Sequence, residues 1–299
     1  MIKRTLFFTK PAYLSTKNKQ LVVNYPEDNA LIKAIPIEDV GMLVLEHQQI
    51  TITNGLLAKL IENKAAIISC DPYHLPISLL QPLVGHSEQT ERIAHQLQAS
   101  VPLKKNLWQQ TVSAKIKNQA VFLEQRQIPA RKLHKWANAV KSGDTENHES
   151  RAAVYYWQHI FGIPHFTRGQ HGEAPNNLLN YGYAILRGIT ARALVSSGML
   201  PSVGIFHRNK YNAFCLADDI MEPYRIFVDI LVNDIVQSGE CYQELNTTLK
   251  MSLLQLPVTD VYIDGHKSPL MVAMSRTTSS LYQCFSGSSR KLLYPELVS

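Results

Sequence analysis

Short apolar runs rich in β-branched and aromatic residues recur through the first 70 residues of the chain. Each run is four to six residues long, which is a common strand length, and polar or turn-forming residues separate them. The polar stretch STKNKQ at 15–20 suits a hairpin. We therefore expect strands at 5–8, 21–25, 41–46, 50–53 and 65–70.

A helical pattern interrupts these runs and later replaces them. In NGLLAKLIENK (54–64), four apolar residues fall on one helix face, and Thr53 or Asn54 can cap it. From about residue 88 onward the 3.6-residue periodicity dominates and β-branched runs are scarce. The pattern predicts an α+β multidomain fold, with a small N-terminal β-rich domain at 1–84 and a larger all-α domain at 85–299.

The last residues, 285–299, begin with a Gly/Ser-rich turn and suggest a mobile tail. The chain has 299 residues, of which 45% are hydrophobic and 18% charged, so it should bury a proper core. No signal-peptide core or membrane-length apolar run is present, which predicts a cytoplasmic protein without a membrane partner. Four dispersed cysteines without a CxxC pair favour reduced core thiols over a zinc site.

Positive charge is concentrated in residues 101–141. This segment has nine basic residues and one acid, a local charge of +8, whereas the whole chain carries +6. Such a concentration attracts a polyanion, most commonly nucleic acid, but a solvated helix face explains it equally well. The basic residues are Lys104, Lys105, Lys115, Lys117, Arg126, Arg131, Lys132, Lys135 and Lys141.

Two helices of the second half carry polar residues that a surface position does not readily explain. One lies within the stretch 143–162, runs from a cap at Asp144 or Thr145 to about Ile160, and places Glu149 on its apolar face. Stabilisation of the helix dipole is the alternative role for this glutamate. The other helix spans 177–197 and ends at Gly198, and the run after it leads to His207, with Lys210 three residues later.

The stretch CLADDIMEPYRIFVD (215–229) brings four carboxylates into an apolar segment of a basic protein. If Asp219 caps a helix in which Pro223 occupies the first turn, Glu222 completes a capping box. That explanation leaves Asp218 and Asp229 unassigned. Arg225 can neutralise one carboxylate, and a divalent metal ion would neutralise more.

Glu149, His207 and Glu222 together offer two carboxylates and one imidazole, with Asp219 as a further oxygen. Such a set suits Mg²⁺ or Mn²⁺ better than Zn²⁺ and is compatible with phosphodiester chemistry in a basic protein. The intervals of 58 and 15 residues between the three match no local motif. Spacing alone therefore leaves open a capping and ion-pairing role for these carboxylates.

Four motifs occur in a characteristic order along the second half of the chain. Together they resemble the CRISPR-associated spacer-acquisition integrase, a metal-dependent endonuclease, and DIMEPYR is similar to the type II branch of that family. The resemblance covers nearly the whole chain. The motifs are ESRAAVYYW (149–157), NLLNYGY (177–183), GMLPSVGIFH (198–207) and LADDIMEPYRIFVD (216–229).

This resemblance implies a catalytic helical domain with Mg²⁺ or Mn²⁺ bound by Glu149, His207 and Glu222, and with Asp219 as a possible extra ligand. It implies insertion of short foreign DNA into a CRISPR array by attack of a 3′-hydroxyl. Lys210 would meet the scissile phosphate, and Arg225 would lie beside the DNA and the site.

The resemblance also implies partners. Homodimers would form through the β domain, and two of them would flank a dimer of a small ferredoxin-like adaptation protein on double-stranded DNA. The effector nuclease is a candidate further partner. Two other functions compete with this one: a non-catalytic basic DNA-binding scaffold, and a metal-dependent hydrolase of a small phosphorylated compound. The extended basic segment disfavours the hydrolase, since a small substrate needs no such surface.

Overall fold

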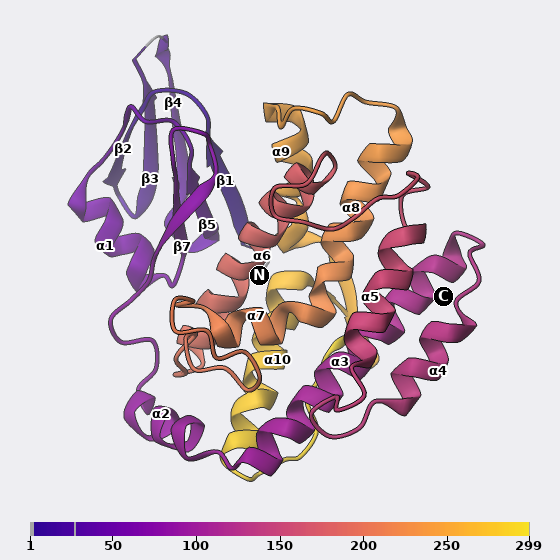
Figure 1. The fold of residues 1–299 in the computed structure, drawn as a ribbon. Coiled ribbons are helices and arrows are strands. Elements are labelled where there is room, and N and C mark those ends of the chain that lie inside the picture. Colours follow the sequence, from indigo (N-terminus) through magenta and orange to yellow (C-terminus); the bar gives the residue numbers. More distant parts are fainter. Residues whose placement is uncertain (1–2, 27, 299) are drawn as a thin grey trace. The chain divides into compact units, whose positions relative to one another are not determined.

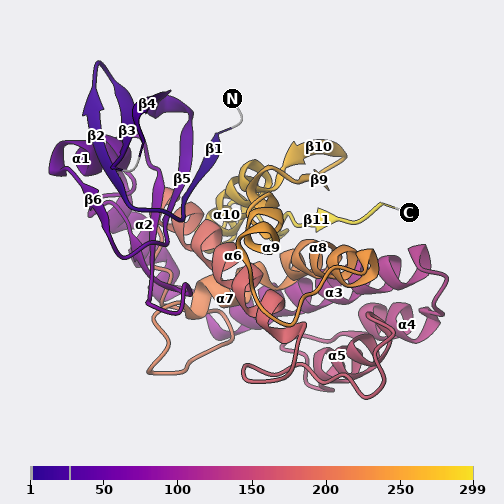
Figure 2. The same ribbon diagram turned by 90° about the horizontal axis from the view of Figure 1, so that it is seen from above.

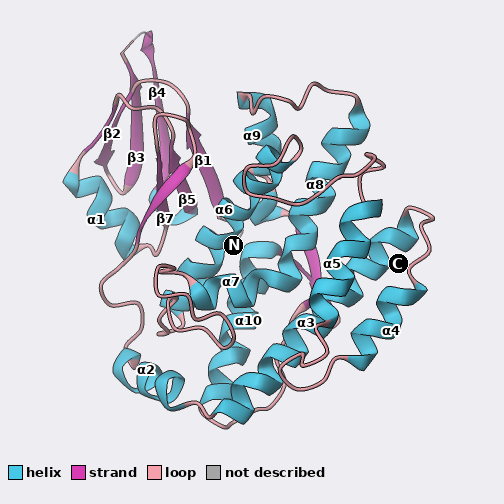
Figure 3. Ribbon diagram, viewed as in Figure 1, coloured by secondary structure: helices cyan, strands magenta, loops and turns pink. Residues whose placement is uncertain are grey.

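The computed structural model describes residues 3–26 and 28–298, and it contains two compact units, Met1–Gly85 and His86–Ser299. Figures 1 and 3 show that strands dominate the first unit and helices the second. The α+β fold class is therefore confirmed. Within the described residues, no helix combines the length and the apolar character needed to cross a membrane.

Two four-stranded sheets build the N-terminal unit. One has the order β1 (Arg4–Phe8), β5 (Val40–Leu45), β7 (Ala66–Cys70), β8 (Pro76–Leu80), and the first three strands run parallel. The other has the order β4 (Asp28–Pro36), β3 (Gln20–Tyr25), β2 (Ala12–Lys17), β6 (Ile50–Ile52). All five expected strands exist, and β2, β4 and β8 were missed.

The hairpin expected at 15–20 joins β2 to β3 through Asn18 and Lys19, which both have positive φ. Such a two-residue turn matches the twist of the strands it connects. The helix α1 (Asn54–Glu62) is capped by Thr53, whose hydroxyl accepts from the Leu56 N–H. Its buried Leu56 and Leu60 join the core of this unit, so the expected cap and apolar face are confirmed.

Nine helices follow in the described part of the second unit, and Figure 2 shows α3 running alongside α8. They are α2 (Gln89–Gln98), α3 (Val101–Gln125), α4 (Arg131–Ala139), α5 (His148–His159), α6 (Asn176–Ser196), α7 (Cys215–Met221), α8 (Arg225–Ser238), α9 (Thr247–Leu253) and α10 (Leu270–Phe285). The unit is not all-α. A small sheet with the order β10 (His266–Pro269), β9 (Asp260–Ile263), β11 (Pro295–Glu296) lies within it.

The helix α6 forms the centre of the helical unit and packs against α7, α8, α9 and α10. It ends where Gly198, at φ 74°, adopts the left-handed conformation and its N–H reaches the Val195 carbonyl. Gly182 permits the close approach of α8, because a Cβ there would lie only 2.4 Å from Val228 Cγ1. The expected span and its glycine stop are thus confirmed.

The C-terminal segment expected to be mobile lies along α3 instead. Asn118 Oδ1 accepts from the Leu297 N–H at 3.0 Å, and Asn118 Nδ2 donates to the Pro295 carbonyl at 3.0 Å. The same Nδ2 also donates to the Pro223 carbonyl at 3.1 Å. Gln110 holds the backbone of Arg290 and Leu292. The Gly/Ser-rich start is therefore only a turn, and the residues after it are packed.

Substituting Gly182 by alanine should destabilise the helical unit by about 1–3 kcal/mol, because the new methyl overlaps Val228. Chemical denaturation monitored by circular dichroism measures this loss. The double variant Gly182→Ala/Val228→Ala should recover part of it, since the clashing methyl is removed. If the two substitutions prove additive, the close contact is not the cause.

Candidate active site

A 3₁₀ turn, Glu222–Tyr224, connects α7 to α8 and positions Glu222. The helix α7 begins at Cys215, so Asp219 lies inside it, and no side chain caps its first turn. The capping box of Asp219 and Glu222, which the sequence left open as an alternative, is therefore not formed. Pro223 falls in the turn, where its missing N–H removes a helical hydrogen bond and the chain bends.

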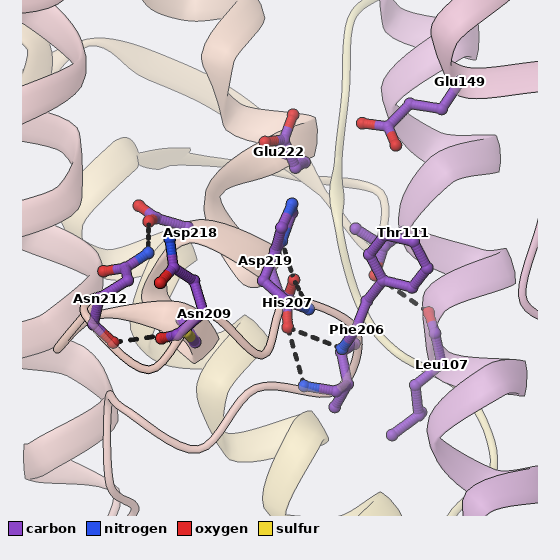
Figure 4. A network of polar contacts seen from close by, with 12 residues as sticks. Leu107, Thr111, Glu149, Phe206, His207, Asn209, Asn212, Asp218, Asp219 and Glu222 are labelled. Carbon is purple, nitrogen blue, oxygen red and sulfur yellow. Dashed lines mark hydrogen bonds and ion pairs between the residues drawn. The ribbon is translucent and has the colours of Figure 1, made fainter. Parts of the chain in front are cut away.

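Asp219 fixes the loop that carries His207. The carboxylate is fully buried, and Oδ2 accepts from the N–H groups of Ile205 and Phe206 at 2.7 and 2.9 Å. Oδ1 accepts from the His207 N–H at 3.2 Å and meets His207 Nδ1 at 2.5 Å. Both oxygens are therefore in use, and Asp219 orients the imidazole instead of facing a metal (Figure 4).

The imidazole of His207 also packs against α3. The Trp108 ring meets it edge-on at 5.7 Å between centroids and stacks on Phe206 at 4.2 Å. With Nδ1 held by Asp219, the other ring nitrogen, Nε2, is the one available to a ligand. In Figure 4 the ring extends toward Glu222.

Glu149 comes to the same region from the first turn of α5. The Asp144 carboxylate accepts from the N–H groups of His148 and Glu149, so the expected capping role of Asp144 is confirmed. The Glu149 side chain is 23% exposed, and Figure 4 shows it projecting from its helix toward the side of Glu222 and His207.

Lys115 of α3 lies between the two glutamates. Its Nζ is 2.7 Å from Glu149 Oε1 and 2.7 Å from Glu222 Oε2. The contact to Glu149 is also a hydrogen bond. The ammonium therefore serves as a shared cation for both carboxylates.

These charges shift the protonation equilibria of the site. Burial opposes ionisation of Glu222, but Arg225 and Lys115 lower its pKa to about 2. Burial also opposes the charge on Lys115, yet Glu222 and Glu149 raise the pKa of this lysine. The hydrogen bond to Asp219 raises the pKa of His207, and the charges of Glu222 and Glu149 add to this effect. Both carboxylates therefore favour the protonated imidazole.

A cavity of about 170 Å³ adjoins this site. Arg225, expected near DNA, borders it with Nε 2.9 Å from Glu222 Oε1 and its guanidinium over the Tyr183 ring. Asp229 closes the cavity, and its carboxylate accepts from the hydroxyls of Tyr156 and Tyr183 at 3.0 and 2.5 Å. Burial raises the pKa of Asp229 to about 6, although both tyrosines and Arg225 oppose the shift.

Two other predicted residues bear on the loop that follows His207: Asp218 of α7 and Lys210 of the loop itself. Asp218 binds Arg187 at 2.7 Å and accepts from Asn212, so it anchors the loop 208–214 and does not support Glu222 directly. Lys210 is exposed on this loop, with its ammonium over the ring of Tyr211.

Sequence reasoning counted Lys115 only as part of a basic segment. A signal for its true position was present, since it is spaced by four residues from each of the buried Thr111 and Gln119 on one face of α3. The basic segment has no single role. Arg126 binds Asn233, and Lys141 pairs with Glu146, whereas Lys105, Lys117 and Lys135 are exposed.

The donor set suits a hard divalent cation, with two carboxylate oxygens and one imidazole nitrogen. An ammonium already stands as a cation between the two carboxylates. As the side chains stand, residues 3–26 and 28–298 contain no group of three His, Cys, Asp or Glu that could hold a metal. The residues therefore fit an ion only if Lys115 moves.

Comparison with known proteins defines the family. The family model described as CRISPR associated protein Cas1 matches residues 6–255. The chain belongs to the Cas1 family. It is 34% identical over its full length, and over 97% of the relative, to a CRISPR-associated endonuclease Cas1 of Neisseria meningitidis serogroup C. This result confirms the resemblance inferred from the four motifs.

Solved structures share the Cas1 fold at low identity. A casposase bound to integration product matches with a TM-score of 0.78 at 18% identity. The match covers 98% of this chain and 92% of the casposase chain. A chain of a Cas6-RT-Cas1–Cas2 complex matches with a TM-score of 0.74 at 20% identity, covering 99% of this chain and 36% of its own. The fold therefore extends over both units of this Cas1 protein.

Replacing Asp219 by asparagine in this Cas1 protein should free the His207 loop and lower the pKa of His207. An amide places a donor where backbone N–H groups need an acceptor, at a cost of about 1–3 kcal/mol in unfolding free energy. An NMR pH titration of the imidazole measures the pKa. Asp218→Asn is the matched control, because Asp218 binds Arg187 instead. An unchanged His207 pKa in Asp219→Asn would contradict this role.

Asp229 gives a pH-dependent stability. Its pKa rises from 3.8 to about 6 on folding, so the native state retains the proton between these values and loses stability as the pH rises through them. An asparagine side chain at this position cannot ionise. The free energy of unfolding of Asp229→Asn, relative to the parent, should therefore increase by up to about 3 kcal/mol between pH 4 and 6.5.

Urea denaturation across this pH range tests the prediction. Asp234→Asn, at an exposed position on the same helix, is the matched control for the loss of one carboxylate. A difference for Asp229→Asn that does not change with pH would mean that folding does not raise the pKa of Asp229.

Proposed function

We propose that this Cas1 protein is a Mg²⁺- or Mn²⁺-dependent DNA endonuclease and integrase that inserts short foreign DNA fragments into a CRISPR array. The observation that carries the proposal is that Glu149 and Glu222, from separate elements, share the Lys115 ammonium at 2.7 Å, while the imidazole of His207 extends toward Glu222 (Figure 4). The endonuclease name of the Neisseria relative and the integration product held by the casposase support it.

Glu149 and Glu222 would supply oxygen ligands to the ion, and His207 Nε2 the nitrogen. A bound divalent ion polarises a phosphodiester and stabilises charge on the attacking and leaving oxygens. Asp219 keeps the imidazole in one orientation, and Arg225 neutralises the outer oxygen of Glu222. Asp219 therefore acts as a positioning residue in this proposal, not as the extra ligand that the resemblance allowed.

The reaction is a transesterification. The 3′-hydroxyl of the incoming DNA loses its proton and its oxygen bonds to a phosphorus of the array strand. The bond from that phosphorus to the neighbouring 3′-oxygen breaks, and this oxygen takes up a proton. The number of phosphodiester bonds is unchanged, so no ATP is required. Water in place of the 3′-hydroxyl gives endonuclease cleavage.

Exposed lysines of α3 and α4, among them Lys105 and Lys135, would bind phosphates without reading sequence. Lys210 would approach the scissile phosphate from the His207 loop. The protein would act as a homodimer through its β-rich unit, with two dimers on a dimer of the ferredoxin-like partner. The similarity to a chain of the Cas6-RT-Cas1–Cas2 complex supports a Cas2 protein as that partner.

An integration assay tests this function. The protein, its small partner, Mn²⁺ and a short duplex with free 3′-hydroxyls are incubated with a supercoiled plasmid that bears the repeat array. Glu149→Gln, His207→Ala and Glu222→Gln should each reduce covalent joining by about 100-fold or more, because each removes a ligand. Binding of the duplex, measured by fluorescence anisotropy, should persist.

Glu146→Gln is the matched control, because Glu146 lies less than one turn before Glu149 and pairs with Lys141 outside the site. It should join DNA like the parent. Equal joining by the parent and all three ligand variants would show that the ligands are wrongly assigned. If the parent and all variants bind the duplex but none of them joins DNA, the result favours the non-catalytic scaffold.

A further inference from the structure

Lys115 shares its ammonium between two glutamates. Its ammonium is 2.7 Å from one oxygen of each of two glutamates that come from different elements, α5 and the turn after α7. Its side chain is only 14% exposed and that of Glu222 8%. Two carboxylates this close, and this shielded from water, repel each other unless a cation lies between them.

Arg225 does not replace this cation. Its guanidinium contacts Oε1 of Glu222, the oxygen on the other side of the carboxylate from the one near Lys115. Glu222 Oε2 and Glu149 Oε1 therefore share Lys115 as their cation. A divalent ion bound by both glutamates would compete for these same two oxygens.

We propose that Lys115 is a built-in counter-ion that holds the two metal-ligand glutamates in place without metal and must leave when a divalent ion binds. The inference rests on the proposed metal site and adds that Lys115 and the metal ion compete for the same two carboxylate oxygens. Both contacts of the ammonium are to carboxylate oxygens at 2.7 Å, so a divalent cation that binds these oxygens takes the place of the ammonium.

The cavity of about 170 Å³ beside the site is lined by Lys115 itself and by Gln119 and Glu222, and Arg168, Arg225 and Asp229 also border it. It gives the lysine side chain space next to Glu222, but the two arginines oppose deep entry of the ammonium. A lysine suits this exchange better than an arginine, because its charge is compact and its four-carbon stem is flexible.

Two linked consequences follow for Lys115→Met. Without metal, the glutamates lose their shared cation and the protein should be less stable than the parent. With metal, no ammonium has to be displaced, so Mn²⁺ should bind about 10-fold more tightly, which corresponds to about 1.4 kcal/mol. The rise in thermal unfolding temperature on adding Mn²⁺ should therefore be larger in the variant than in the parent.

Isothermal titration calorimetry with Mn²⁺ alone, and thermal unfolding with and without Mn²⁺, test this without DNA. Lys117→Met is the matched control, since it removes the same charge from an exposed position two residues along α3. It should bind Mn²⁺ like the parent. Lys115→Met/Glu149→Gln removes one carboxylate with the ammonium and should regain stability without metal.

The outcomes separate the inference from the function. Equal Mn²⁺ affinity in the parent, Lys115→Met and Lys117→Met overturns the counter-ion role and leaves the metal site standing. No Mn²⁺ binding in the parent or in any variant overturns the proposed metal site itself. If Lys115→Met does not fold without metal, folding on addition of Mn²⁺ and in the double variant supports the role, whereas failure of both overturns it.

Discussion

Charge buried in the helical unit is the constraint on which its structure depends. Asp218, Asp219, Glu222 and Asp229 come from one short segment and all are buried. Asp218 pairs with an arginine, and Asp219 accepts from backbone N–H groups and a histidine. Glu222 lies between a lysine and an arginine, and Asp229 accepts from two tyrosine hydroxyls. Because an unpaired buried carboxylate costs several kcal/mol, these partners fix how α3, α6, α7 and α8 assemble.

The positions of His207 and Glu222 follow from the way these buried carboxylates are satisfied. Asp219 lies in the middle of α7 and reaches backward to hold the loop at 205–207, which fixes the imidazole of His207. The bend at Pro223 turns Glu222 toward α3. Glu149 is brought in by the Asp144 cap of α5. Three elements distant in sequence thus converge without any local motif.

The sequence predicted the parts whose signals are local. The strand runs, the Thr53 cap, the stop at Gly198 and the division between β-rich and helical regions were all readable from composition and period. The capping box of Asp219 and Glu222 does not form because α7 starts four residues earlier, at Cys215, and the carboxylate is used by a distant loop. Strands β9 to β11 are two to four residues long, too short to show a pattern. Lys115 was missed because partners at 149 and 222 lie far from it along the chain.

Asn118 connects the carboxyl end of the chain to the turn that carries Glu222. One amide group donates to the carbonyls of Pro223 and Pro295 and accepts from Leu297, and it lies one helical turn from Lys115. Removal of residues 295–298 would therefore take away two hydrogen-bond partners of the amide that also holds the backbone next to Glu222.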